Sequence, residues 1–396
     1  MANHHIPLHF FAWWLLLSIR YAEKLKQQSI YHMFEDFKKT SKKVWQENVE
    51  ADLKGQPIES LYWQVEAHLS AEPFYHPDDF TEPAPYIASQ RSSNDWAIGE
   101  TFDTLNLKEA NAKAIAALSG GVNAPEFILS KTLSPEDFDE LFTRINPAFI
   151  STHFILESEA SLPETFSNWI TWLNVHHVNI DELKGSFFKE GSKSTEVVKV
   201  IFNQANQALP HFTLFNAIAL KTTAPSETLA ELTSEANNFL KKMQEAGFAV
   251  EDAARQVQFD ISIGKDFFVE ISRIRALRLL WANLLKAYNC DPAIPVKICA
   301  RCNHSALEKE ENQNMIAAAT IALSAVIGGV DRLYVAPAGP KNEAFTRRIA
   351  RNVQHLLKME SFLDKVIDPA AGSYYIETLT RQLGEQAWKQ FSNITG

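Results

Sequence analysis

The fold class follows from VQFDIS (residues 257–262), FFVEISRIRALRLLWANLL (267–285) and VKICA (296–300), which succeed one another along the chain. The first and third runs are short and rich in residues that favour strands, whereas the long run between them is typical of a helix. A strand, a helix and a second strand in this order predict two parallel strands joined by a crossover helix.

The same alternation recurs along most of the chain. Candidate strands lie at 96–102, 125–129, 148–156, 197–202, 212–220, 257–262, 296–300 and 332–336. Eight parallel strands predict an α/β fold of the (β/α)8 TIM-barrel type, whose chemistry should lie at the carboxyl ends of the strands. A doubly wound open sheet is the weaker alternative, because no Gly-rich phosphate loop follows the first strand.

The run 230–247 is predicted to be one of the crossover helices. Its apolar residues, among them Leu232, Leu240 and Met243, recur at spacings of mostly three or four residues. Gly247 follows where a helix end favours a residue that tolerates the left-handed conformation. Residues 243–247 therefore belong to a helix and not to a loop at a strand end.

Composition indicates a globular protein with a large core. The chain has 396 residues, of which 46% are apolar, and its net charge is −10. No block of five or more Lys or Arg occurs, so nucleic-acid binding is excluded. An anionic ligand would need a local cluster of positive charge, which the net charge cannot reveal.

Cys290, Cys299 and Cys302 are too few for a disulfide framework in a chain of this length, which predicts a cytoplasmic location. Cys299 and Cys302 form a CxxC with His304 close by. A zinc site needs about four ligands, and no second pair lies nearby. These residues are therefore interpreted as ordinary strand and loop residues, with no metal.

The beginning of the chain stands apart from the rest. FFAWWLLLSI (10–19) is about half as long as a membrane span and lacks the basic flank of a signal peptide, so no membrane segment is predicted. Either it is an amphipathic appendage, or translation begins at Met33; we favour the second reading, which makes 1–32 a start-site extension. A polar, helical arm (33–80) and the barrel (81–396) follow.

Four further stretches carry a resemblance. They are VWQENVEADLKG (44–55) with PFYHPDD (73–79), FFVEISRIRALRLLWANLL (267–285), IALSAVIGGVDRLYV (321–335) and RRIARNVQHLLKMESFLDKVIDPAAGSYYIETLT (347–380). Together, and in this order, they resemble the methylmalonyl-CoA mutase family. The resemblance implies a (β/α)8 barrel for an acyl-CoA, followed by a cobalamin-binding domain. It also implies adenosylcobalamin radical chemistry that interconverts succinyl-CoA and (R)-methylmalonyl-CoA.

The sequence departs from the family's catalytic pattern. The cobalt-binding motif Asp-x-His-x-x-Gly does not occur, and the chain stops at Gly396. WAIGET (96–101) places Gly99 and Thr101 where the family has Arg and Tyr. The family's Tyr-His-Met-Gln-Glu-Ala-Gly falls on LFNAIALKTT (214–223), with Asn216 and Ala217 near the Tyr and His positions. KKMQEAG (241–247) therefore repeats its letters inside a helix.

The family's His-x-Gln-Thr-Ser-Gly-Trp block falls on CARCNHSAL (299–307), which leaves His304 as a loop histidine. The sequence thus predicts no catalytic, cofactor-binding or metal-binding residue on this chain. Heterodimeric mutases of the family pair a catalytic large subunit with a small one that keeps the barrel and loses the active site. This sequence resembles that small subunit, which implies inactivity alone and adenosylcobalamin bound by the large subunit.

Two other functions stay open from the sequence. The barrel could bind an acyl-CoA itself and work with a separate cobalamin domain, in which case Tyr and His should stand near Asn216 and Ala217. Alternatively, the chain could be a regulatory or chaperone-docking module. A radical mutase needs a group that polarises the thioester carbonyl and a cobalt ligand, and the loss of both favours the small subunit.

Several remaining motifs receive structural interpretations. YHPDD (75–79) should cap a turn, KEGSKST (189–195) should be a flexible connection, and His176 and His177 would face opposite ways in a strand.

Charged and aromatic residues suggest surfaces. The predicted helix 267–285 carries Glu270, Arg273, Arg275 and Arg278, which are expected in a solvated stripe or weak ion pairs, or else at a subunit contact. The arm carries the aromatic and apolar residues Trp45, Leu61, Tyr62 and Trp63, which cannot form a core alone. The arm is the predicted contact with a partner.

Overall fold

The computed structural model describes residues 40–79, 91–189, 195–219, 224–302, 310–339 and 343–395. The chain divides into two compact units, one made of Met1–Tyr62 with Tyr75–Thr81 and the other of Trp63–Phe74 with Glu82–Gly396. The predicted start-site extension, residues 1–32, lies outside the described residues, as do His304 and most of KEGSKST.

The first unit contains helix α2 (Lys42–Asp52) and a short 3-10 turn, η1 (Ile58–Leu61). Ser41 caps α2, because its Oγ accepts a hydrogen bond from the Val44 amide at 3.4 Å. None of the residues of α2 is buried. The helix is therefore held by its cap and by local contacts, without a core of its own.

The motif YHPDD caps a turn, as predicted. The His76 amide donates to Asp79 Oδ2 at 2.8 Å, and Pro77–Asp79 form the 3-10 turn η2. Lys42 Nζ lies 2.6 Å from Asp79 Oδ1, which ties the start of α2 to this turn. The carboxylates of the motif thus have structural partners.

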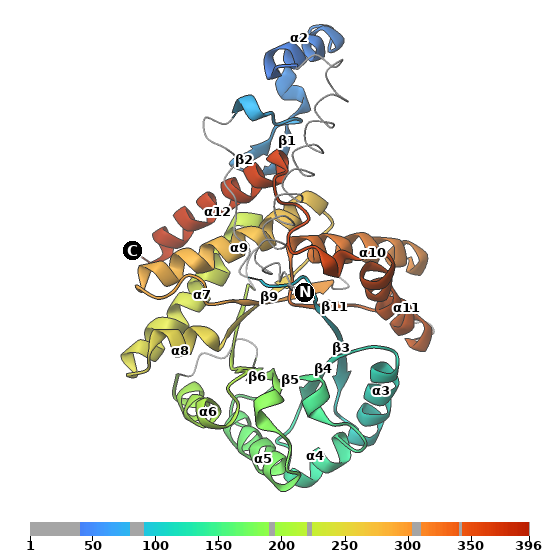
Figure 1. The fold of residues 1–396 in the computed structure, drawn as a ribbon, viewed down its shortest axis with the longest axis vertical. Helices are drawn as coiled ribbons and strands as arrows, with labels where there is room; N and C mark the ends of the chain where they lie inside the picture. The colour runs from blue at the N-terminus through green and yellow to red at the C-terminus, as the bar shows by residue number, and fades with distance from the viewer. Residues whose placement is uncertain are drawn as a thin grey trace, which may run out of the picture. The chain divides into compact units, whose positions relative to one another are not determined.

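The second unit is built around one parallel sheet (Figure 1). Its segments are β3 (Ala97–Asp103), β4 (Ala124–Leu129), β5 (Ser151–Leu156), β6 (Lys184–Lys189), β7 (Phe212–Thr213), β8 (Phe215–Ile218), β9 (Val257–Ser262), β10 (Lys297–Cys302) and β11 (Arg332–Val335). They lie in the order β7-β6-β5-β4-β3-β11-β10-β9-β8, and all neighbours pair in parallel.

The sheet closes into a barrel where β7 and β8, at the two ends of the strand order, follow each other along the chain. Only Leu214 separates β7 from β8, and its amide donates to Gln256 O at 3.1 Å. Because β7 pairs with β6 and β8 pairs with β9, the two segments together occupy one strand position. The nine segments therefore form an eight-stranded barrel, which confirms the predicted fold class.

One predicted strand is wrong. Residues 197–202 lie in helix α6 (Thr195–Ala208), and the position in the barrel belongs to β6. Ile201 and Ala205 are both buried and four residues apart, which is the spacing of one helix face. The β6 run begins and ends with Lys and contains Gly185, so its strand character is weak in the sequence. Gly185 is required there, because a Cβ would collide with Thr152 O.

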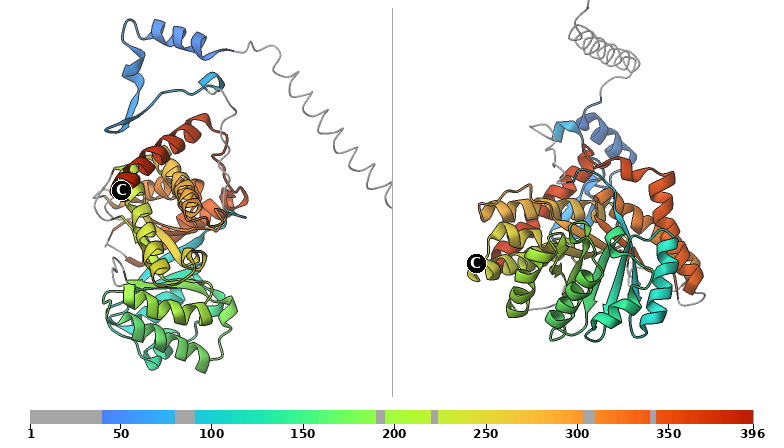
Figure 2. Two further views of the ribbon diagram at one scale, coloured as in Figure 1. Left: turned by 90° about the vertical axis from the view of Figure 1, so that its left-hand side faces the viewer. Right: turned by 60° about the horizontal axis from the view of Figure 1, so that its bottom comes forward.

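Helices surround the barrel (Figure 1). They are α3 (Leu107–Ser119), α4 (Pro135–Leu141), α5 (Leu162–Val175), α6, α7 (Pro225–Glu245), α8 (Val250–Arg255), α9 (Phe267–Ala287), α10 (Glu311–Gly328), α11 (Glu343–His355) and α12 (Tyr374–Thr395). The last helix, α12, packs against α7 and α9 (Figure 2). A hairpin of β1 (Trp63–Glu66) and β2 (Leu69–Ala71) also belongs to this unit, and Glu66 accepts a hydrogen bond from the Ser226 amide at the start of α7.

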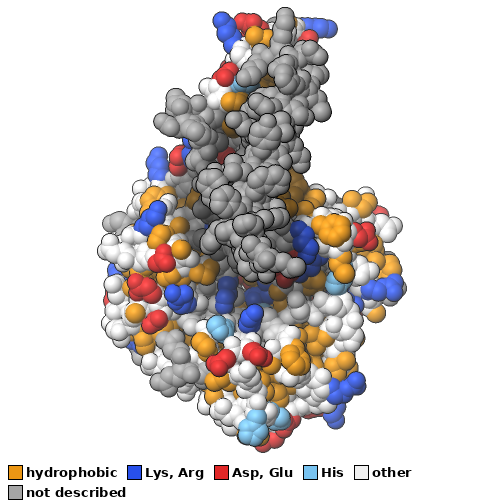
Figure 3. Space-filling view, viewed as in Figure 1, with side chains coloured by type: hydrophobic (Ala, Val, Ile, Leu, Met, Phe, Trp, Pro, Cys, Tyr) orange, Lys and Arg blue, Asp and Glu red, His pale blue; other side chains and the backbone are white. Residues whose placement is uncertain are grey.

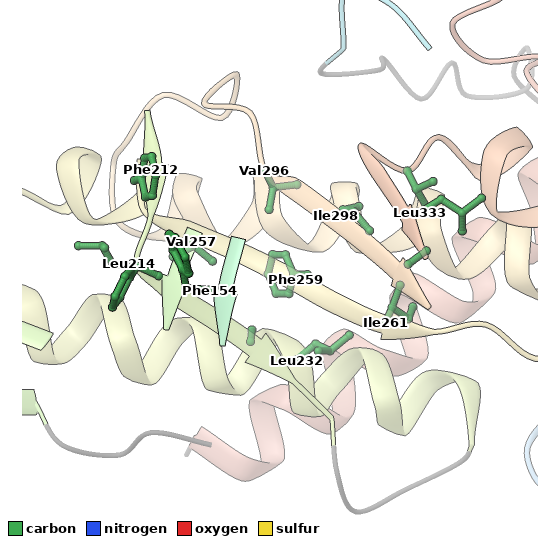
Figure 4. Close-up of a cluster of buried hydrophobic side chains, with 14 of the residues drawn as sticks. Phe154, Phe212, Leu214, Leu232, Val257, Phe259, Ile261, Val296, Ile298 and Leu333 are labelled. Atoms are coloured by element: carbon green, nitrogen blue, oxygen red, sulfur yellow. The ribbon is translucent and has the colours of Figure 1, made fainter. Parts of the chain in front are cut away.

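Alternation along each strand separates the core from the barrel interior. In β9, Val257, Phe259 and Ile261 belong to the hydrophobic cluster between strands and helices (Figure 4). Gln258 and Asp260 lie between them in the sequence and point to the opposite face. The apolar core therefore lies outside the barrel, whereas the interior receives the polar positions.

The predicted crossover helix is confirmed. Gly247 has φ +90°, its amide donates to Gln244 O at 2.9 Å, and the Phe248 amide donates to Met243 O at 3.1 Å. This pair of hydrogen bonds is the Schellman arrangement that ends a helix. KKMQEAG therefore forms the end of α7, with Ala246 as its C-cap and Gly247 directly after it, and it does not lie at a strand end.

The predicted solvated stripe on residues 267–285 is wrong. Arg275 is buried and pairs with Glu377 at 2.8 Å and with Asp368 at 3.0 Å. Arg278 pairs with Asp331 at 2.8 Å, and Arg273 pairs with Glu270 at 2.8 Å. The cause is α12, which covers one side of α9 and brings Glu377 onto Arg275. The pair Arg275–Glu377 joins α9 to α12, Arg273–Glu270 lies within α9, and Asp368 and Asp331 bind α9 to residues outside the helices.

Within the part of the chain that the structure describes, no helix is both long enough and apolar enough to cross a membrane.

Candidate functional site

Three charged side chains and two neutral polar ones, each from a different strand, meet inside the barrel. We call this group the central ion cluster, and its members are Thr101 of β3, Glu126 of β4, Asp260 of β9, Arg301 of β10 and Tyr334 of β11. Barrel interiors of this fold are usually filled by layers of branched apolar residues. Here the filling is polar, so each charge must find its counterpart within the interior.

Arg301 is the centre of the cluster. Its Nη1 and Nη2 donate to the two oxygens of Glu126 at 2.8 and 2.7 Å, and its Nε donates to Asp260 Oδ2 at 2.7 Å. Thr101 Oγ1 adds a hydrogen bond to Glu126 Oε1 at 2.9 Å. Planar, two-pronged pairing of this kind is the geometry for which a guanidinium is suited.

Tyr334 lies beside Arg301 and depends on Gly99. Its ring centroid is 4.5 Å from Arg301 Cζ, a cation–π distance. A Cβ on Gly99 would stand 2.5 Å from the Tyr334 ring, so only glycine at position 99 leaves space for it. Gly99, one of the positions singled out from the sequence, is therefore the residue that admits a tyrosine from β11.

The ionisation states follow from burial and pairing. Burial alone would raise the pKa of Glu126, but the charge and hydrogen bonds of Arg301 outweigh it and lower the pKa. Burial raises the pKa of Tyr334 well above its usual range, so its phenol stays neutral. Glu126 is thus an ionised partner of Arg301 and is poorly suited to act as a general base.

A second layer lies nearer the amino-terminal ends of the strands and consists of His153, Gln258 and Arg332. Arg332 Nη1 is 2.8 Å from both ring nitrogens of His153, and Arg332 Nη2 donates to Gln258 Oε1 at 3.2 Å. Burial, with repulsion from Arg332, lowers the pKa of His153 well below its usual value. His153 is therefore neutral and also contacts Ser151 and Ser186.

The positions singled out by the family pattern lie around these layers. Thr101 belongs to the central ion cluster, and Asn216 accepts a hydrogen bond from Gln258 Nε2 at 3.0 Å. Ala217 faces the hydrophobic core. Neither an acid nor an ionisable ring stands at position 216 or 217.

The fold does not bring the cysteines and the adjacent histidines together into one site. Cys299 and Cys302 are buried thiols, and burial raises the pKa of Cys299 to about 12. His176 and His177 lie at the end of α5 and not in a strand, and His176 pairs with Asp139 at 3.0 Å. Among the described residues, no group of three His, Cys, Asp or Glu could hold a metal ion.

Sequence reasoning missed the central ion cluster. Glu126, Asp260 and Arg301 each stand between two apolar neighbours in their strands. This alternation indicates that they face the interior. It cannot indicate that they meet one another, because their strands are far apart in the sequence.

Comparison with known proteins identifies relatives over most of the chain. The family model described as methylmalonyl-CoA mutase matches residues 134–396. The methylmalonyl-CoA mutase small subunit of Porphyromonas gingivalis is 32% identical over 398 residues, covering 91% of this chain and 64% of that protein. The chain thus spans less than two thirds of the length of that relative.

Both subunit types of one organism also match. The small subunit of Streptomyces virginiae is 34% identical over 160 residues, covering 39% of this chain and 26% of that protein. The large subunit of the same organism is 30% identical over 230 residues, covering 54% of this chain and 30% of that protein. With the family model matching well over half of its residues, this chain belongs to the methylmalonyl-CoA mutase family.

Proposed function

We propose that this chain is the small subunit of a heterodimeric, adenosylcobalamin-dependent methylmalonyl-CoA mutase. The reaction, interconversion of succinyl-CoA and (R)-methylmalonyl-CoA, takes place in the large subunit. The small subunit stabilises its partner through a large interface. The relatives named as small subunits support this assignment.

The central ion cluster is the observation that carries the proposal. A substrate that reacts inside a barrel needs space on the axis and a free donor for its carbonyl oxygen. Here Arg301 occupies the interior and directs its guanidinium at Glu126 and Asp260. Removing these contacts would leave two buried carboxylates without a counter-ion, which is costly.

The described residues do not fit a cobalt ligand. The imidazole that the resemblance implies as the cobalt ligand belongs to the motif Asp-x-His-x-x-Gly, and no described histidine stands in such a motif. His153 is in β5 but lies in the second layer, between Ser151, Ser186 and Arg332. We therefore assign the cofactor to the partner.

The arm is the proposed contact with the large subunit. Helix α2 buries none of its residues, and the apolar side chains of Val44 and Leu61 are exposed. An arm that cannot form a core alone gains stability when a partner covers these side chains. The three free cysteines support a reducing compartment, the cytoplasm, as the location of the complex.

The test is co-expression with the longer mutase homologue of the same organism. We expect the two chains to co-purify in equal amounts and the complex to isomerise acyl-CoA when adenosylcobalamin is added. This chain alone should bind no cobalamin and show no turnover, since Arg301 is engaged by Glu126 and Asp260 inside the barrel. Val44→Asp in the arm should weaken co-purification, whereas Lys108→Glu on α3 should not.

Turnover by this chain alone, or with a separate cobalamin domain, would contradict the proposal and support a catalytic acyl-CoA barrel. Co-purification with a chaperone instead of a mutase chain would support a docking module.

A further inference from the structure

A cavity of about 570 Å³ lies between the carboxyl-terminal ends of α4 and α5; we call it the helix-end pocket. Its lining comes from residues 139–149 and 172–182, and no residue of a barrel strand takes part. The volume is in the range of pockets that hold small organic molecules. Figure 3 shows His and acidic side chains next to one another at the lower end of this face, where Figure 1 places α4 and α5.

Stacked rings form part of the lining. The Trp172 ring stacks on Trp169 at a centroid distance of 5.2 Å, and His176 stacks on Trp172 at 4.4 Å. Asp139 holds two of these rings, because its Oδ1 accepts from Trp172 Nε1 at 2.8 Å and lies 3.0 Å from His176 Nε2. The other ring nitrogen of His176 is 2.9 Å from Trp172 O. Trp172 and His176 line the pocket, so a ligand would meet rings that are already ordered.

Phe149 adds an exposed ring to the pocket. It ends the 3-10 turn η3 (Pro147–Phe149), and its side chain is 80% exposed. Among the large apolar side chains that the structure describes, only Leu105 is as exposed. Beside a cavity, such a ring offers a stacking contact to a flat ligand.

Two ionisable residues at the pocket have backbone conformations that favour glycine. Arg144, after α4, has φ +64°, and His177, directly after α5, has φ +51°. The His177 amide donates to Asn174 O at 3.2 Å and the Val178 amide donates to Leu173 O at 3.0 Å, a helix end that usually has glycine at this position. Both side chains line the pocket. Unfavourable backbone conformations of this kind gather at binding sites, where a ligand offsets their cost.

The pocket has one unpaired charge of each sign. Arg144 and Glu182 are exposed, and neither side chain has an ion pair or a hydrogen bond to another described residue. Asp139, in contrast, is already engaged by Trp172 and His176. A ligand with a carboxylate and an ammonium would supply a partner to each of the two unpaired charges.

We propose that the helix-end pocket binds an aromatic zwitterion of the amino-acid type. Its ring contacts Phe149 and His176, its carboxylate pairs with Arg144, and its ammonium pairs with Glu182. A ligand with a single charge would leave one of the two residues unpaired. The proposal goes beyond the role of a mutase subunit, because the barrel strands contribute no residue to this site.

Isothermal titration calorimetry on the full chain tests the proposal. The probe is L-phenylalanine, compared with 3-phenylpropionate, which lacks the ammonium, 2-phenylethylamine, which lacks the carboxylate, and L-leucine, which lacks the ring. We expect each analogue to bind at least about threefold more weakly than L-phenylalanine, because an exposed charge pair or a ring contact contributes this much. Phe149→Ala should weaken the binding of L-phenylalanine by about the same factor.

Arg144→Gly is the most informative variant. Glycine adopts the positive φ without strain, so the fold is kept while the partner of the carboxylate is lost. Binding of L-phenylalanine should weaken about threefold, whereas binding of 2-phenylethylamine should not change. The matched control is Lys54→Gly, which also replaces an exposed cation at positive φ, +52°, but lies outside the pocket and should leave binding unchanged.

Three results would overturn the proposal. The first is no binding of L-phenylalanine at millimolar concentration. The second is equal affinity for L-leucine and L-phenylalanine, because the pocket would then not recognise a ring. The third is an equal loss of affinity in Arg144→Gly and Lys54→Gly, because binding would then depend on net charge alone.

Discussion

Two arginines inside the same barrel, on neighbouring strands, have opposite surroundings. Arg301 of the central ion cluster contacts two carboxylates through three of its nitrogens. Arg332 of the second layer contacts a neutral histidine and an amide, its Cζ lies 5.6 Å from the centroid of the same Tyr334 ring, and it faces a cavity. A buried charge whose partners are all within the protein serves the structure. A buried charge beside a cavity, held by neutral groups, contributes less to it.

The largest effect is expected from Arg301→Met. It would leave Glu126 and Asp260 buried without a counter-ion, so the free energy of unfolding should fall by about 3–5 kcal/mol. Urea denaturation followed by circular dichroism measures the loss. Arg332→Met is the matched control, and it should cost less than half as much because it strands no carboxylate. Equal losses for the two variants would show that their surroundings are not energetically different.

Gly99→Ala tests the close contact between position 99 and the Tyr334 ring inside the barrel. The new Cβ would press on the Tyr334 ring, and overpacking of this kind should cost about 1–3 kcal/mol of unfolding free energy. Tyr334→Leu in the same background should recover part of the loss, because it removes the ring atoms that the new Cβ meets. A double-mutant cycle by urea denaturation measures the coupling. Additive effects would show that the two positions do not compete for space.

The smallest expected effect is at the cavity that Arg332 faces, which Lys184 and Lys297 also line. Lys184→Gln/Lys297→Gln should change the free energy of unfolding by less than about 0.5 kcal/mol, because neither ammonium pairs with a carboxylate. Thermal denaturation at neutral pH measures this. A loss above about 1 kcal/mol would mean that these lysines hold the barrel together, and the distinction between the two regions would fail.

A strand could be predicted from the sequence where one of its faces is apolar, and it could not be predicted where neither face is. Residues 257–262 alternate between core and interior, and they form β9 as predicted. The run 197–202 has the same residue types but lies in α6, because Ile201 and Ala205 are buried on one helix face. A short apolar run is compatible with either structure, and its neighbours in space decide between them.

From the sequence, the candidate site was described only by the family residues that it lacks. Gly99, Asn216 and Ala217 indicated from the sequence that the family's ring donors are missing at these positions. What replaces those groups was not predictable. Tyr334 enters the interior from β11 and reaches the space above Gly99 only because β11 pairs with β3.

Local patterns in the chain were enough to predict most of the alternation of strands and helices, including the crossover helix that contains residues 230–247. These are short-range properties, since period-two and helical repeats lie within a few residues of one another. The folded barrel was needed to reveal that Arg301 meets Glu126 and Asp260 while Arg332 meets no described carboxylate. Partners across a closed barrel depend on strand order and register, which bring together residues more than a hundred positions apart.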